Sequence, residues 1–315
     1  MSTIQTNTTT EAADPKMGRF KKSWLLVKGS WKAFMLDKEL ASLPLISGLL
    51  SILVFATAFT IGLINHEAFV TVTKTTGGGE LQYKWPAVMA MIIVGIITTG
   101  ISMIFGGAII HGALERFKGN DPTIKSSLRA ALKRGGSLLG FGLFSYVIGY
   151  ILSYIAERVP FIGAKIIAWL ASSAWSVATF FAIPVIVTSD TAANPIDASK
   201  KSIELIKKTW GESLIVSAGI GIISGLTVFV WVALYTALMV FAGVGLHANG
   251  WVIGGGAALG LLSVVVLVLV FSALEAFAKA AIYHYATTGE SPAAFDGRLM
   301  RQAFTQKKAR KVFGA

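Results

Sequence analysis

The side chains that could do chemistry are few, and they lie near the ends of long apolar segments. His111 and Glu115 are four residues apart, so in a helix they share one face. His284 occupies the matching place in a later segment, where the pattern Ala-Ile-x-His-x-Ala occurs again. Imidazoles and carboxylates together could bind a divalent metal or a phosphate headgroup. The spacing lacks the specificity of a HExxH zinc motif, so it favours hydrogen bonding at a membrane surface.

Glu275 and Lys279 form a second candidate pair, one helical turn apart near the end of an apolar segment. An ionisable residue near a membrane interior is a functional hypothesis, such as a proton or ion relay. The structural alternative is an ion pair in which Lys279 extends toward the headgroups. The sequence contains no cysteine, no Ser-His-Asp set and no metal motif. We therefore expect no enzyme, no catalytic residue, no bound metal and no cofactor.

These candidates are positioned by six apolar segments without Lys, Arg, Asp or Glu. A membrane-spanning helix needs about 20 apolar residues, and most of the six reach or exceed that length. The composition agrees, with 54% apolar and only 14% charged residues. The sequence predicts an all-α fold, a polytopic transmembrane bundle of six helices. The predicted spans are 43–65, 85–114, 137–155, 166–187, 213–241 and 251–274.

The basic residues fall almost entirely on one side of these spans. Seven Lys and Arg precede the first span, six follow the second, four follow the fourth and six lie in the tail. The three opposite segments together carry four. This asymmetry predicts a multi-pass cell-membrane protein with both termini in the cytoplasm. The net charge of +12 therefore indicates contact with anionic lipid headgroups and not with nucleic acid.

The chain divides into a polar N-terminus (1–18) predicted to be disordered, a transmembrane domain (19–290) and a basic cytoplasmic tail (291–315). The stretch 21–31 recurs as 200–210, with Lys-Lys-Ser, Leu, Lys and Trp at identical spacing. A weaker copy begins at Ile124. Membrane exits can resemble one another by composition alone. We interpret the similarity as an internal repeat of helical hairpins, with each of three units formed by an interfacial helix and two spans.

The segments 20–36 and 195–209 are predicted to be amphipathic helices lying along the cytoplasmic interface. Their apolar faces carry aromatic and β-branched residues with lysines beside them. The first face holds Trp24, Val27, Trp31 and Phe34, and the second holds Ile196, Ile203, Ile206 and Trp210.

Smaller features predict local structure. The outer loop 66–84 alternates Val with Thr around a triple glycine, which is typical of a β-hairpin. Two Gly-x-x-x-Gly motifs, beginning at Gly221 and Gly256, indicate close helix contacts. Pro184 is expected to kink the fourth span, either as a hinge or as a static bend.

One stretch carries a resemblance to known proteins. Phe181-x-x-Pro184-x-x-Val187 is followed by Pro195-Ile196-x-Ala198, Ser202, Leu205 and Trp210. This pattern resembles uncharacterised prokaryotic membrane proteins related to the membrane domain fused to some glycerophosphoryl diester phosphodiesterases. Asp37-Lys38 and Leu43-Pro44 are similar to the uncharacterised branch. The resemblance implies a six-helix fold in a prokaryotic cell membrane. It implies no catalytic residue, because the phosphodiesterase domain has no counterpart here.

Three functions are compatible with these features. The first is a non-enzymatic protein that organises lipid or a membrane partner, and the sequence leaves open whether a second copy is that partner. The second is a transporter of lipid or small solutes, with a pathway along spans three and four. The third is a lipid-modifying enzyme, in which His111, Glu115, Glu275 and His284 would converge within about 4 Å. The transport pathway would follow Tyr146, Tyr150, Tyr154, Ser172, Ser176 and Thr179.

Overall fold

The computed structural model describes residues 19–37, 39–40, 42–75, 78–158, 162–189, 194–208, 212–245 and 249–298. Within these residues, six helices are long and apolar enough to cross a membrane, which confirms the six predicted spans. The fourth span consists of two helices, α7 and α8, separated by a short turn. The spans are α2 (Ser42–Ile64), α4 (Trp85–Phe117), α6 (Gly135–Arg158), α7 (Ile162–Ala178) with α8 (Ala182–Thr188), α10 (Glu212–Val240) and α11 (Gly250–Thr288).

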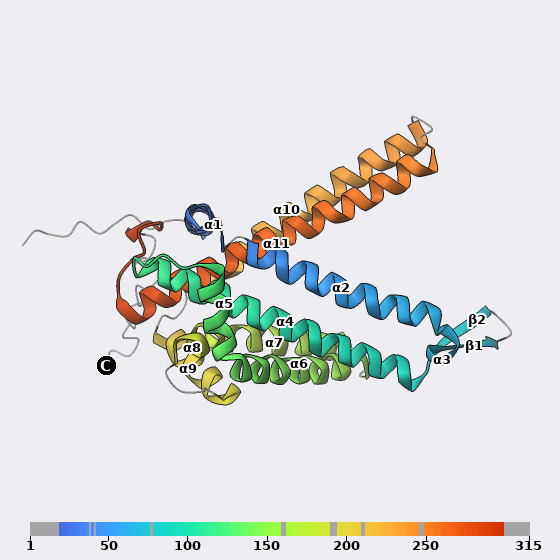
Figure 1. Ribbon diagram of the computed structural model, residues 1–315, viewed down its shortest axis with the longest axis horizontal. Coiled ribbons are helices and arrows are strands. Elements are labelled where there is room, and N and C mark those ends of the chain that lie inside the picture. The colour runs from blue at the N-terminus through green and yellow to red at the C-terminus, as the bar shows by residue number, and fades with distance from the viewer. Residues whose placement is uncertain are drawn as a thin grey trace, which may run out of the picture.

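The spans pack in sequence order as three helical hairpins. α2 packs against α4, α6 against α7, and α10 against α11. Figure 1 shows the α10–α11 pair turned away from the other spans, whereas α4 of the first hairpin runs alongside α6 of the second. The predicted six helices are present, but over the described residues they do not pack along their full length as one bundle. Lipid tails are as apolar as the helix surfaces, so no hydrophobic force requires the hairpins to close.

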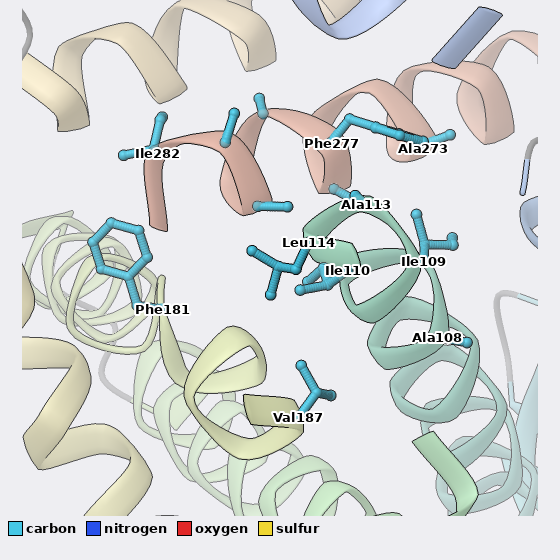
Figure 2. Close-up of a cluster of buried hydrophobic side chains, with 14 of the residues drawn as sticks. Ala108, Ile109, Ile110, Ala113, Leu114, Phe181, Val187, Ala273, Phe277 and Ile282 are labelled. Atoms are coloured by element: carbon cyan, nitrogen blue, oxygen red, sulfur yellow. The ribbon is translucent and has the colours of Figure 1, made fainter. Parts of the chain in front are cut away.

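The buried residues gather at the end where the hairpins meet. They come from the last turns of α4 and α11, from α8, and from three short helices (Figure 1). In Figure 2, Ile110 and Leu114 of α4 lie between α11 and α8, which carries Val187. We call this end the packed layer. Its short helices are α1 (Arg19–Leu36), α5 (Ile124–Lys133) and α9 (Pro195–Lys208).

α4 and α11 are longer than a bilayer requires. α4 has 33 residues and α11 has 39, so they are about 50 and 58 Å long. The hydrocarbon core is only about 30 Å thick. With Trp85 and Trp251 at the far interface, the surplus turns of both helices extend into the packed layer.

The short helices follow a regular pattern of contacts. α5 packs mainly on α4, which precedes it in the chain, and α9 packs on α8 and α7. α1 packs on α10 and α11 at the other end of the chain. α5 and α9 therefore each pack on the hairpin that precedes them in the chain. α1 has no preceding hairpin and packs on the last one. The predicted repeat remains a prediction, although this element order agrees with three units.

Two predicted helix features are present. The turn between α7 and α8 covers Thr179–Phe181, and Pro184 cannot donate a hydrogen bond to the Phe180 carbonyl, so the break matches the expected kink. Gly256 and Gly260 of α11 lie against Met239 and Tyr235 of α10. By contrast, Gly221 and Gly225 face open space among the described residues, so this second motif makes no close helix contact there.

At the far end of the molecule the outer loop forms the predicted hairpin. After the short helix α3 (His66–Phe69), strand β1 (Val70–Thr75) pairs antiparallel with β2 (Gly78–Tyr83), and Val70 lies opposite Tyr83. Figure 1 places this hairpin opposite the packed layer. The predicted disordered N-terminus (1–18), Trp210 and most of the basic tail lie outside the described residues.

Candidate functional site

Glu275 and Lys279 form an ion pair on α11, with 2.8 Å between the Glu275 Oε1 and Lys279 Nζ atoms. The Lys279 ammonium also lies 5.4 Å from the centre of the Phe180 ring. Glu275 is 24 residues beyond Trp251, or about 36 Å along the helix, which places it past the hydrocarbon core. Its side chain is 49% exposed. Glu275 is therefore partly solvated, and an ion pair with a structural role accounts for its charge at this position.

Glu115 and His111 share a face of α4, but other groups bind the carboxylate. Lys118 Nζ donates to Glu115 Oε1 at 2.8 Å, and Asn120 Nδ2 donates to Glu115 Oε2 at 2.6 Å. These bonds fold the chain back after α4, where Gly119 adopts a φ of 87°. The buried Nδ1 atom of His111 has no hydrogen-bond partner among the described residues.

His284 is buried where the ends of α4 and α11 meet. Its ring lies edge-on to Phe117 at 6.1 Å between centroids, and Phe117 makes the same kind of contact with Phe295 at 5.9 Å. The Lys118 ammonium is close enough to interact electrostatically with the imidazoles of both His111 and His284. His284 therefore belongs to an aromatic contact between helix ends.

The four residues that a lipid-modifying enzyme would need do not form one cluster. Glu275 and His284 are nine residues apart on one helix, which separates them by about 13 Å along its axis. Glu115 is held by Lys118 and Asn120. Among the residues that the structure describes, no group of three or more His, Asp or Glu side chains could hold a metal ion.

A stronger charged contact was not predicted from the sequence. Arg116 binds Asp37 through two hydrogen bonds, Nε to Oδ2 at 2.6 Å and Nη2 to Oδ1 at 2.7 Å. The same Nη2 atom donates to Asp121 Oδ1 at 2.5 Å. Asp37 directly follows α1 and Arg116 lies in the last turn of α4, so the pair connects two parts of the packed layer. The only sequence signal was an acidic residue just after a predicted interfacial helix, and 79 residues separate the partners.

Helix α1 presents different residues to the protein and to the outside. Leu26, Ser30 and Ala33 are buried, and α1 packs on α10 and α11. Trp24 and Trp31 are exposed on the other side. Of the predicted aromatic face, only Phe34 is fully buried, because it reaches the Phe277 ring of α11.

Exposed basic side chains lie on all three short helices of the packed layer. We call them the basic surface. It consists of Lys21, Lys28 and Lys32 of α1, Lys125, Arg129 and Lys133 of α5, and Lys200, Lys201 and Lys207 of α9.

Most of the polar residues predicted to line a pathway in spans three and four are exposed. Tyr150, Ser172 and Ser176 are exposed, and Tyr154 lies beneath the guanidinium of Arg158 at 5.1 Å. Tyr146 lies against Gly95 of α4.

Six apolar helices in three hairpins define a multi-pass membrane protein. The chain belongs to a family of unknown function, DUF6159, whose pattern matches residues 81–293. That match covers five of the six spans together with α5 and α9, and α1 and α2 precede it. No match was found among the curated proteins or among the solved structures. The relation to phosphodiesterase membrane domains stays an expectation from the sequence.

Proposed function

We propose that this protein is a non-enzymatic organiser of the cell membrane. Its packed layer rests on the cytoplasmic face and collects anionic lipid headgroups, while its three hairpins extend into the bilayer. The observation that carries this proposal is the basic surface. Three helices from distant parts of the chain place exposed cations at the one end where the apolar hairpins meet. Each cation near an anionic membrane surface contributes about 1 kcal/mol to lipid attraction.

The orientation follows from the distribution of charge. Twenty-three Lys and Arg lie in the segments on the side of the packed layer, and four lie in the opposite segments. The positive-inside rule assigns the richer side to the cytoplasm. The exposed Trp24 and Trp31 support an interfacial position for α1, since tryptophan favours the level of the headgroups.

Lipid organisation explains the geometry better than transport does. A transport pathway along spans three and four needs polar groups that face an interior space. Tyr150, Ser172 and Ser176 are instead exposed in the single chain. A non-enzymatic role also agrees with the separation of Glu275 from His284 along α11.

Lipid selectivity of a charge-neutralised variant tests the proposal. The triple variant Lys125→Gln, Arg129→Gln, Lys133→Gln removes the cations of α5, none of which forms an ion pair among the described contacts. We expect the protein in mixed nanodiscs to enrich phosphatidylglycerol over phosphatidylcholine, and the variant to lose about tenfold or more of that preference. Native mass spectrometry of the released complexes measures both lipids.

The matched control neutralises cations on the opposite side. Lys84→Gln with Lys165→Gln removes two exposed lysines near the far ends of the spans. We expect this variant to keep the preference of the parent protein. The proposal is wrong if the parent shows no preference for phosphatidylglycerol, or if the control loses as much as the α5 variant.

A further inference from the structure

An apolar cavity of about 240 Å³ lies where α2 and α11 meet at the edge of the packed layer. Its lining residues come from the first two helices of the chain and from the last. They include Phe34 of α1, Pro44 and Leu45 of α2, and Val266, Val270 and Ala273 of α11.

The cavity lies beside a contact between two hairpins. A Cβ atom on Gly48 of α2 would lie 2.8 Å from the Leu269 side chain of α11, so the helices touch there. Further toward the far interface, Leu49 and Leu262 are exposed and the hairpins separate (Figure 1). Ala273 is 22 residues beyond Trp251, or about 33 Å, which places the cavity at the edge of the hydrocarbon.

The chemistry of the lining excludes water as a stable occupant. Ser42 is its one hydroxyl, and that group already donates to the Glu39 carbonyl at 2.7 Å. An apolar cavity without free polar partners does not hold ordered water. The cavity is also open, because Leu45 and Val266 are 44% and 42% exposed. Since both residues lie on membrane-spanning helices, the surrounding medium is lipid hydrocarbon.

The rim of the cavity carries the features of a headgroup level. Phe34 lines the cavity and lies 5.8 Å from the ring of Trp31, which is exposed on the outer face of α1. Exposed tryptophan marks the boundary between acyl chains and headgroups. Lys28 and Lys32 are exposed on the same helix, within two turns of Phe34. The helix that contributes Phe34 to the apolar cavity therefore also carries two exposed cations.

We propose that this cavity binds one acyl chain of an anionic phospholipid in the leaflet beside the packed layer. The phosphate lies over α1 near Lys28 and Lys32, and the chain enters between α2 and α11. The headgroup part rests on the proposed function, whereas the acyl-chain part rests on the cavity alone. The occupied cavity fills the junction between the first and the last hairpin.

A pair of tryptophan substitutions tests the site in the full chain. Val266→Trp fills the cavity, while Val268→Trp adds the same side chain at a 50% exposed position of α11 that does not line it. The proteins are purified from nanodiscs, exchanged into a delipidating detergent and examined by native mass spectrometry. We expect the parent and Val268→Trp to retain one phospholipid per chain, and Val266→Trp to show at least tenfold lower occupancy.

A second pair guards against a folding defect. Leu45→Trp and Ile46→Trp repeat the comparison on α2, where Leu45 lines the cavity and Ile46 does not. Unfolding temperatures in detergent confirm that the variants fold. Equal lipid retention within both pairs overturns the proposal. So does a parent protein that retains only detergent, or one in which a second copy of the chain occupies the site.

The headgroup and chain contributions are separated by comparing dioleoyl phosphatidylglycerol with dioleoyl phosphatidylcholine. If both lipids are retained equally and Val266→Trp loses both, the result supports acyl-chain binding in the cavity and contradicts the proposed headgroup selectivity. If phosphatidylglycerol is preferred and Val266→Trp retains it fully, the selectivity stands and the cavity proposal fails.

Discussion

Arg116 donates two parallel hydrogen bonds to Asp37 and thereby connects the end of α1 to the end of α4. The Asp37 side chain is only 5% exposed, so its charge is compensated almost entirely by this guanidinium. Two oxygen atoms and two nitrogen atoms in a fork define the orientation as well as the distance. The contact connects α1 to the last turn of the first hairpin.

Removal of one partner from this pair should destabilise the packed layer. Asp37→Asn leaves Arg116 with only the exposed Asp121, and loss of one member of a buried pair costs about 3 kcal/mol. We expect a clearly lower unfolding temperature in detergent, measured by tryptophan fluorescence. Glu39→Gln, an exposed acidic neighbour, serves as the control and should change little. Equal unfolding temperatures for the two variants would show that the pair contributes nothing.

The Glu275–Lys279 pair should contribute much less. Glu275 is half exposed, so solvent screens the interaction and the pair is worth about 0.5 kcal/mol. Glu275→Gln, Lys279→Met and the double variant form a thermodynamic cycle read from thermal stability. The structural interpretation fails if Glu275→Gln leaves stability intact and abolishes a proton-linked flux in proteoliposomes. The transporter hypothesis would then take first place.

The sequence predicts well what depends on local pattern. Apolar length identified the six spans, and the Val-Thr alternation with its glycines identified the β1–β2 hairpin. The divergence of the hairpins was not predictable, because apolar periodicity does not distinguish a helix facing lipid from one facing another helix. Asp37 and Arg116 were missed for a different reason. Their contact joins distant segments, and a charge at a span end is usually solvated.

The two glycine motifs should respond to substitution in opposite ways. Gly260→Ala places a methyl group against the Tyr235 ring, where overpacking costs about 1–3 kcal/mol. Gly225→Ala meets open space and gains up to about 1 kcal/mol of helix propensity. Thermal stability in detergent should therefore fall for the first variant and hold or rise for the second. A destabilised Gly225→Ala would reveal a helix contact that the single chain lacks.

The tryptophans of α1 should lie at the level of the headgroups. Trp24 and Trp31 face away from the protein, and the interface is their preferred environment. In a background where the other tryptophans are replaced by phenylalanine, lipids brominated near the headgroup should quench them more than deeply brominated lipids do. Stronger quenching by the deep label would contradict the interfacial position of α1.

The packed layer should face the cytoplasm, because the basic residues are divided twenty-three to four. The structure places residue 75 at the end of strand β1, and residues 125 and 200 in α5 and α9. Residue 247 lies outside the described residues, in the sequence between α10 and α11. Alkaline phosphatase fused after 75 or 247 should be active outside the cytoplasm, and fusions after 125 or 200 should be inactive. A green fluorescent protein fused at the same positions should give the complementary pattern. Active phosphatase at 125 and 200 would show that the packed layer lies outside the cytoplasm. Its lysines would then not contact the anionic cytoplasmic leaflet on which the proposed function depends.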